Sequence, residues 1–222
     1  MGFQIKNGVL RHYREEPGVT EVVIPDGVTR IGDGAFYSCE SLTSITIPES
    51  VVKIDCSAFA FCYRLTSITI PAGVTRIEKY TFHCCMNLTD VVIPEGVTSI
   101  GKLAFACCHE LTNVVLPASL VSIERQAFAD CRSLSSITIP EGVTRIERGA
   151  FGQCSELTDI VIPDSVTSIG DSAFAWCGKL KSVVLPTGVT DIGEHIFWGC
   201  TDLADESGLV IMHGTLYSCV VD

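Results

Sequence analysis

The chain has 222 residues, a formal net charge of −11 at pH 7 and 47% hydrophobic residues. The acidic balance disfavours nucleic acid as a partner, because binding to phosphates relies on Lys and Arg. No uncharged apolar run approaches the roughly 20 residues of a membrane-spanning helix, so membrane insertion is not expected. Residues 1–16 contain no apolar segment of the kind found in signal peptides.

Residues 1–24 are expected to form an N-terminal hairpin cap. Asn7-Gly8 lies between two short apolar runs in GFQIKNGVL (residues 2–10), and this dipeptide is typical of a tight β-hairpin turn. A cap is needed because the first coil of a stacked array would otherwise leave strand edges and apolar side chains exposed.

Residues 25–207 contain eight copies of one 23-residue unit. A unit of this length cannot bury its apolar side chains alone, so neighbouring units must stack around a shared core. The repeat therefore predicts a β-rich solenoid of eight coils in a single domain. The residues that hold the register are prolines from Pro25 to Pro186, phenylalanines from Phe36 to Phe197, cysteines from Cys39 to Cys200 and leucines from Leu42 to Leu203.

Each unit is predicted to contain two short strands separated by turns. In LTSITIP (residues 42–48), Ile45 and Ile47 alternate with Thr46, as in a strand that turns one side to the core. Pro48 has no N–H for a sheet ladder and ends this strand, and the PEG or PES sequence that follows suits a turn. The β-branched VTRI segment then predicts a second strand. GAFYSC and its equivalents are too short for an α-helix and predict a tight turn or a short 3₁₀ segment.

Residues 208–222 are expected to form a C-terminal hairpin cap or the start of a further module. GLVIMHGTL (residues 208–216) aligns with residues 2–10, and Gly214 corresponds to Gly8. Ile196 and Trp198 in the last coil replace residues that are mostly alanine in earlier coils, which favours a cap. The alternative is that a second array begins here in a longer protein.

Eight of the twelve cysteines form the recurring column. A free cysteine behaves as a small apolar side chain with a weak S–H donor, which suits a crowded corner where a turn offers backbone groups. Side chains stacked in one column point the same way, whereas a disulfide requires converging Cβ atoms. These thiols are therefore predicted to stay reduced.

Cys84 and Cys107 lie outside the column and one repeat apart. Their expected Cα separation is one that a disulfide accepts, so a cross-coil disulfide is one alternative for this pair. A zinc site would also need His83 or His109, which lie in different columns on either side of the pair and are predicted to diverge. We therefore expect no metal site and no cofactor.

Two surfaces are candidates for binding. The outward positions of the inner sheet form a flat platform of small side chains, which either reflects β-propensity alone or makes a broad contact. The candidate contact residues of this platform are Asp90, Val92, Asn113, Val115, Ser136, Thr138, Asp159 and Val161. A basic stripe in four successive coils is either solvated and neutralised by neighbouring glutamates or a docking site for an acidic partner. The stripe consists of Lys79, Lys102, Arg125 and Arg148.

No catalytic activity is predicted. A catalytic site brings unlike groups together, whereas a regular solenoid lines up like with like. The five histidines fall in scattered columns, and no Gly-rich phosphate loop, HExxH motif or GxSxG motif occurs.

Over residues 25–203 the unit resembles the repeat of the BspA-like leucine-rich-repeat proteins, which has the form aFxxCxxLxxixiPxxvtxIg. The resemblance implies a right-handed leucine-rich-repeat solenoid with a parallel inner sheet. It also implies a cell-surface or secreted, adhesin-like protein that binds a protein or glycan of unknown identity, and we expect a monomer. Two other roles stay open from the sequence, a structural spacer that presents a fused domain and an intracellular protein-interaction scaffold.

Overall fold

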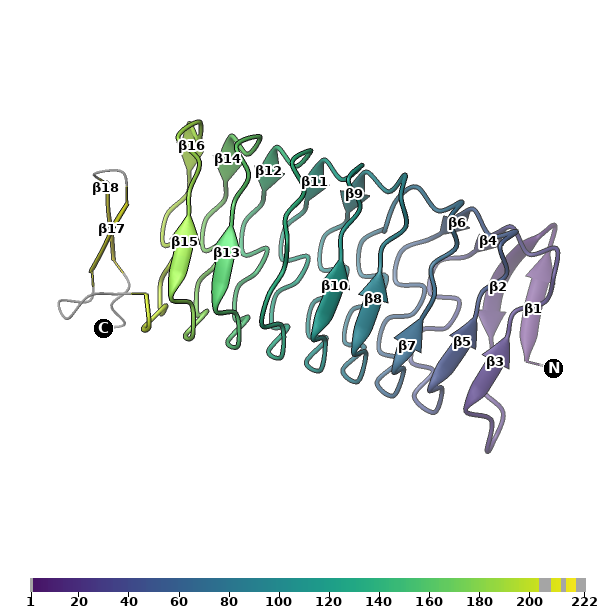
Figure 1. Ribbon diagram of the computed structural model, residues 1–222. Helices are drawn as coiled ribbons and strands as arrows, with labels where there is room; N and C mark the ends of the chain where they lie inside the picture. Colours follow the sequence, from purple (N-terminus) through teal and green to yellow (C-terminus); the bar gives the residue numbers. More distant parts are fainter. Residues whose placement is uncertain (1, 204–208, 213–214, 219–222) are drawn as a thin grey trace.

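The structure is a computed structural model that describes residues 2–203, 209–212 and 215–218. The chain winds into a row of stacked coils and forms one elongated β-solenoid of about eight turns, which begins at β1 and β2 (Figure 1). The predicted solenoid is thus confirmed. Within the described ranges, no helix has the length and apolar character that a membrane crossing requires.

One parallel ladder contains the LTSITI segments, and its strands pair in register. Ile45 in β5 lies between Val22 in β3 and Ile68 in β7, and all three are buried while Thr46 is exposed. The alternation in the sequence therefore predicted the correct inward face. The strands of this ladder are β3 (Glu21–Val23), β5 (Ser44–Thr46), β7 (Ser67–Ile68), β8 (Asp90–Val92), β10 (Asn113–Val115), β13 (Asp159–Val161) and β15 (Ser182–Val184).

This first ladder has an interruption that the sequence did not predict. Pairing stops at β10 and resumes at β13. Between them, residues 136–138 contribute only an isolated bridge from Ser136 to Asp159. The inner sheet is therefore split into a five-stranded part and a two-stranded part.

A second parallel ladder contains the VTRI segments, and an isolated bridge between Ile77 and Ile100 belongs to the same row. The isoleucines of this ladder face the core in most coils, although Ile192 in the last one is exposed. Its strands are β4 (Arg30–Ile31), β6 (Lys53–Ile54), β9 (Ser99–Ile100), β11 (Ser122–Ile123), β12 (Arg145–Ile146), β14 (Ser168–Ile169) and β16 (Asp191–Ile192).

The GAFYSC segments form a third hydrogen-bonded row, made of turns rather than of strands or 3₁₀ helix. In each coil three alternate N–H groups donate to carbonyls of the next coil. For the coil around Phe128, the donors Gln126, Phe128 and Asp130 reach the carbonyls of Arg148, Ala150 and Gly152 at 3.0, 2.8 and 2.7 Å. The turn segments are thus tied to their neighbours from Gly34 to Trp198 without the interruption that occurs in the first ladder.

Two positions in every turn segment have a positive φ, which is the second feature that the sequence did not predict. They lie two residues before and two residues after the recurring phenylalanine, and φ at these positions is 54–75°. Left-handed backbone is unfavourable for L-residues and worst for β-branched ones, and no β-branched residue occurs at any of these positions. The first column is Gly34, Ser57, Tyr80, Leu103, Gln126, Gly149, Ser172 and His195, and the second is Ser38, Phe61, Cys84, Cys107, Asp130, Gln153, Trp176 and Gly199.

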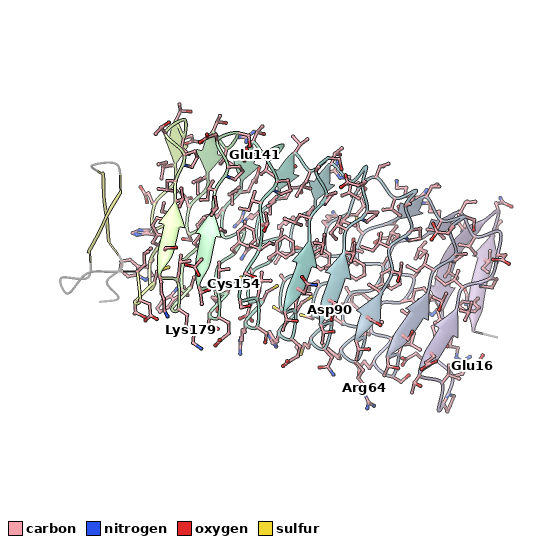
Figure 2. The ribbon with its side chains drawn as sticks, viewed as in Figure 1. Glu16, Arg64, Asp90, Glu141, Cys154 and Lys179 are labelled. Carbon is pink, nitrogen blue, oxygen red and sulfur yellow. The ribbon has the colours of Figure 1, made fainter. Side chains whose placement is uncertain are left out.

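The core is a single column of stacked apolar side chains enclosed by the coils. The eight recurring phenylalanines have no exposed surface, and neighbouring rings lie nearly parallel with centroids 5.1–6.0 Å apart. Charged side chains such as Arg64 and Lys179 extend outward from the coils (Figure 2). Coils of identical shape allow each ring to repeat the position of the one before, which is why the phenylalanine column holds its register.

The two ends differ from the coils. β1 (Phe3–Lys6) and β2 (Val9–Tyr13) form an antiparallel hairpin around Asn7-Gly8, and β2 then pairs in parallel with β4. Phe3 and Tyr13 continue the ring column, with Tyr13 5.2 Å from Phe36. β17 (Leu209–Met212) and β18 (Thr215–Ser218) also pair antiparallel. The turn between them, including Gly214, and residues 204–208 lie outside the described residues, so whether residues 208–222 form a cap or a new module stays a prediction.

Candidate binding face and thiol cluster

The platform residues predicted from the sequence all face solvent. Their most apolar column is a row of valines, of which Val92, Val115 and Val161 expose 60%, 47% and 63% of their surface. Side chains at the other column are short and polar, and Ser182 donates to Asp159 at 2.7 Å. The platform has no aromatic or arginine anchor, which are the side chains that usually dominate binding energy.

A shallow groove crosses the platform where the first ladder is interrupted. It is lined by Asn113 and Val115 on one coil and by Ser136 and Thr138 on the next, and Glu95 and Glu141 also contribute to the lining. Four of the predicted platform residues therefore border one depression.

The basic stripe is exposed except at Lys102, which is half-buried, and both alternatives given above for the stripe stay predictions. Glu124 accepts from Arg76 at 2.8 Å, and Glu78 lies 3.7 Å from the same guanidinium. Lys102 instead lies above the ring of Tyr80, 6.0 Å from its centroid. Arg148 reaches the edge of a pocket on the turn face. The other two stripe residues, Lys79 and Arg125, are exposed to solvent.

The turn face contains a variable column, which runs from Ser38 to Gly199. Every position in this column has the same left-handed backbone, so the backbone does not demand a particular side chain beyond excluding β-branched ones. The side-chain chemistry of this column changes from coil to coil, while the neighbouring cysteine and phenylalanine columns stay uniform. This column is therefore one part of the coil where specificity is free to vary.

A pocket of about 390 Å³ opens on the turn face near the last coils. Trp176 is 48% exposed and Trp198 contacts His195 edge-on at 5.3 Å. The pocket is lined by Gln126, Ala129, Arg148, Gly149, Gly152, Gln153, Ser172, Ala175, Trp176, His195 and Trp198. Sequence reasoning missed this site because Trp176 lies two coils from Gln126 and residues of four columns line the pocket.

Gly199 makes room for the Trp176 indole. A Cβ at Gly199 would lie 2.7 Å from the ring, so a larger residue there would displace the indole. Trp176 and Gln153 also border a second hollow, lined by Asp130, Arg132 and Ser155. The indole thus packs against the next coil and keeps 48% of its surface exposed.

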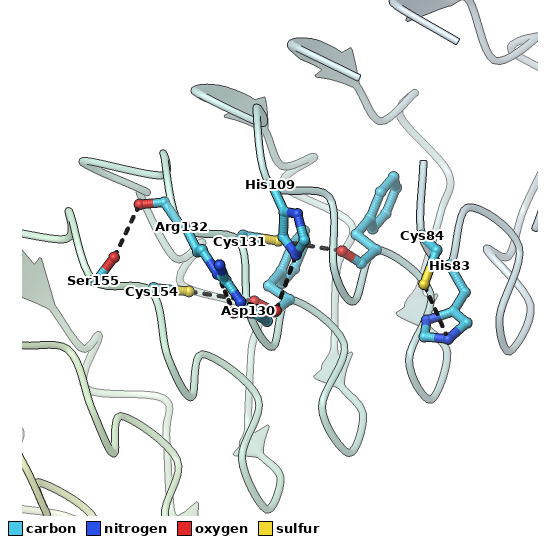
Figure 3. A network of polar contacts seen from close by, with 10 residues as sticks. His83, Cys84, His109, Asp130, Cys131, Arg132, Cys154 and Ser155 are labelled. Carbon is cyan, nitrogen blue, oxygen red and sulfur yellow. Dashed lines mark hydrogen bonds and ion pairs between the residues drawn. The ribbon is translucent and has the colours of Figure 1, made fainter. Parts of the chain in front are cut away.

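His83, Cys84 and Cys107 converge on the same turn face, further towards the N-terminus. Their ligand atoms all lie within 4.8 Å of one another, and Cys84 Sγ is 3.5 Å from His83 Nε2 (Figure 3). The prediction that the histidine diverges from the cysteine pair is therefore wrong for His83. Cys84 has a left-handed backbone conformation, which turns its side chain back alongside that of His83. In an extended segment the side chains of two successive residues would point to opposite sides.

The environment of this thiol cluster, which we define as His83, Cys84 and Cys107, is partly buried. Burial raises the pKa of Cys84, and burial together with the neighbouring Cys84 raises the pKa of Cys107 to about 12. Burial also lowers the pKa of His83, so its ring is neutral at pH 7. Both cysteines are free thiols in the structure. The alternative of a disulfide between them is still a prediction.

His109 and Asp130 lie beside the thiol cluster. His109 Nε2 is 3.0 Å from Asp130 Oδ2, and Arg132 donates to both oxygens of Asp130 at 2.8 and 3.2 Å (Figure 3). Burial alone would raise the pKa of Asp130, but the hydrogen bonds from Arg132 and His109 outweigh it and lower the pKa below its ordinary value. Cys107, His109 and Asp130 also have ligand atoms within 4.8 Å of one another.

The recurring cysteines are buried and hydrogen-bonded, as the sequence predicted. Cys131 donates to the carbonyl of Phe105 at 3.2 Å, Cys154 donates to that of Phe128 at 3.3 Å, and the same bond recurs along the column (Figure 3). Burial raises the pKa of Cys154 to about 12. A protonated, enclosed thiol is a poor nucleophile, so this column is structural.

Thiol titration checks this assignment. In the native reduced protein we expect the eight column cysteines to resist an aromatic disulfide reagent at neutral pH, while Cys56, which is partly exposed, reacts first. All twelve thiols should react after unfolding in guanidinium. Rapid reaction of the column thiols in the native state would contradict their structural role.

Comparison with known proteins places these features in a family. The family model described as the BspA type leucine-rich repeat region matches residues 11–134 and 75–204. No curated protein matches.

Solved bacterial structures have the same architecture. A T. pallidum leucine-rich repeat protein is 32% identical with a TM-score of 0.70, over 89% of this chain and 83% of that one. A Bacteroides ovatus leucine-rich repeat protein is 29% identical with a TM-score of 0.60, over 91% and 67%. A leucine-rich cell surface protein of Faecalibacterium prausnitzii is 34% identical with a TM-score of 0.53, over 84% and 66%. Because the matched repeats span most of the sequence, the chain belongs to the BspA-type leucine-rich repeat family.

Proposed function

We propose that this chain is a non-catalytic binding module that recognises a glycan at the tryptophan pocket of its turn face. Leucine-rich repeats of this family commonly serve in interaction and adhesion. The observation that carries the proposal is the pocket between Trp176, Trp198 and Arg148, which combines aromatic rings with planar polar groups.

The chemistry of the pocket suits a sugar better than an apolar ligand. The exposed face of an indole packs against the apolar C–H face of a sugar ring, and Trp is an effective anchor because it is rigid and large. Gln126, Gln153 and Arg148 offer amide and guanidinium groups around it that pair with hydroxyls. The pocket is open on one side, as recognition of one residue in a longer chain requires.

A surface or secreted, adhesin-like role is part of this proposal. It is supported by the relative that is described as a leucine-rich cell surface protein. The platform of the inner sheet would then be a secondary contact, because its small side chains offer area without an anchor.

A binding screen with matched variants tests the proposal. The full chain is applied to a panel of glycans and extracellular-matrix proteins, and we expect glycan binding that falls about 30-fold or more in Trp176→Ala, as for a hot spot of about 2 kcal/mol. Phe61→Ala removes an aromatic side chain from the same column on a distant coil and should leave binding unchanged.

A double variant on the platform tests whether binding occurs there instead. Val92→Lys with Val115→Lys places two charges on exposed positions of the first ladder and should not affect glycan binding. Loss of binding in this double variant together with full binding in Trp176→Ala would place recognition on the platform instead. Binding only to matrix proteins would contradict the glycan assignment.

A further inference from the structure

We propose that His83, Cys84 and Cys107 bind one thiophilic divalent metal ion of the zinc class, with the fourth coordination position open to solvent. This site is separate from the tryptophan pocket and does not depend on the proposed glycan function. It comprises two soft sulfur ligands and one imidazole, a set that zinc and similar ions prefer.

The distances are close to those of a tetrahedral site. With zinc–sulfur and zinc–nitrogen bonds of about 2.3 and 2.0 Å, a tetrahedral angle separates sulfur and nitrogen by roughly 3.5 Å. The separation of Cys84 Sγ and His83 Nε2 is 3.5 Å. The Cys107 sulfur lies within 4.8 Å of both, so a small side-chain adjustment would complete the three-ligand set.

The histidine is held in position and is incompletely satisfied. Its ring packs edge-on against Phe61 at 5.3 Å and against Tyr80 at 5.6 Å, which leaves it little freedom to turn away. Among the described residues, His83 Nδ1 is buried without a hydrogen-bond partner, and the other ring nitrogen, Nε2, faces Cys84 Sγ and is the one available as a ligand.

The repeat explains how the ligands meet. Cys84 and Cys107 occupy the same left-handed position of successive coils, and each donates its N–H to the following coil at 2.8 Å. Their side chains therefore leave the turn face in parallel and one coil apart. His109 is held by Asp130 at 3.0 Å and is not assigned as a ligand; this pair instead flanks Cys107.

Metal binding would convert both thiols to thiolates and release two protons to solvent. The sulfurs supply the negative charge that balances the ion, so no further acidic ligand is required. The open position lies on the Cys107 side, because Cys107 is partly exposed and Cys84 is buried.

Titration of the reduced full chain with Co²⁺ and with Zn²⁺ tests the proposal. We expect one Co²⁺ per chain, with a sulfur-to-cobalt charge-transfer band in the near ultraviolet and the strong visible bands of tetrahedral cobalt, and displacement of cobalt by Zn²⁺. Cys84→Ser, Cys107→Ser and His83→Ala should each weaken binding by about 100-fold or more, beyond the 10–100-fold typical of losing an outer-shell contact.

These variants are expected to fold, because other coils have the same replacements. Ser38 occupies the cysteine position and Ala60 the histidine position in earlier coils. Unchanged circular dichroism of the metal-free variants checks this. Cys56→Ser removes a partly exposed thiol elsewhere and His109→Ala removes the neighbouring imidazole, and both should bind cobalt as the unmodified chain does. Absence of the charge-transfer band, its survival in Cys84→Ser with Cys107→Ser, or its loss in His109→Ala would overturn the three-ligand site.

Discussion

Replacing Phe128 by alanine should destabilise the solenoid by about 3–5 kcal/mol, which is the range for deleting a fully buried phenylalanine. The ring has no exposed surface and lies between Phe105 and Phe151, at centroid distances of 5.3 and 5.5 Å. Because every coil contacts only its neighbours, a cavity at this central position weakens the coupling of the two halves of the stack. No other part of the chain can move in to fill it, since the second ladder and the hydrogen-bonded row of turn segments hold the coil spacing.

Denaturant unfolding followed by circular dichroism measures this effect, and a second, separate transition would show that the halves have become uncoupled. Phe61→Ala is the control, because this ring is partly exposed and makes edge contacts with Tyr37 and His83 rather than joining the central column. Its loss should reduce stability by about 1 kcal/mol. Equal effects of the two substitutions would mean that the ring column is not the main source of cohesion.

Replacing Gln126 by proline should reduce stability by more than about 3 kcal/mol. Gln126 has a φ of +56°, whereas proline requires a φ near −65°. Proline also removes the N–H that donates to the carbonyl of Arg148 at 3.0 Å, so the third hydrogen-bonded row is broken at a central coil. The turn would have to change its backbone conformation and would pull the adjacent Phe128 out of register.

Replacing Gln126 by glycine should instead increase the stability of the solenoid. Gly34 and Gly149 occupy this column with φ values of +59° and +62°, so the coil accepts glycine there. Relief of the left-handed strain, about 1–2 kcal/mol, exceeds the roughly 0.5–1 kcal/mol that glycine loses through chain entropy. Gln126→Gly should therefore raise the melting temperature, and a lower value in thermal unfolding would show that the left-handed turn is not a source of strain.

The distribution of uniform and variable columns connects the fold to its proposed functions. The phenylalanine, cysteine and leucine columns hold the same residue through the stack, and the other columns that face the core hold mostly apolar residues of similar size, because each coil must match the next. The column from Ser38 to Gly199 contains aromatic, thiol, carboxylate and amide side chains on an identical backbone. Both the tryptophan pocket and the thiol cluster use this column, so one surface row of the solenoid provides two sites of different chemistry.

The sequence was sufficient to predict the inward residues, the strand positions and the buried cysteine column. These features follow from the 23-residue pattern of apolar residues. The pattern applies equally to the positions equivalent to Ile45, Phe128 and Cys154 in the other coils. It also predicted that the platform residues are exposed. It was wrong about His83, because the direction of that side chain depends on a left-handed residue next to it.

The sequence by itself determined that the coils stack. Each short repeat unit can bury its apolar side chains only against the neighbouring units. Only the tertiary structure decided which side chains meet on the turn face. Trp176, Arg148 and Gln126 come from three coils, and His83 joins the pair of Cys84 and Cys107. The physical reason is that these meetings depend on the directions of side chains beside left-handed residues of the turn. The 23-residue pattern alone does not give those directions.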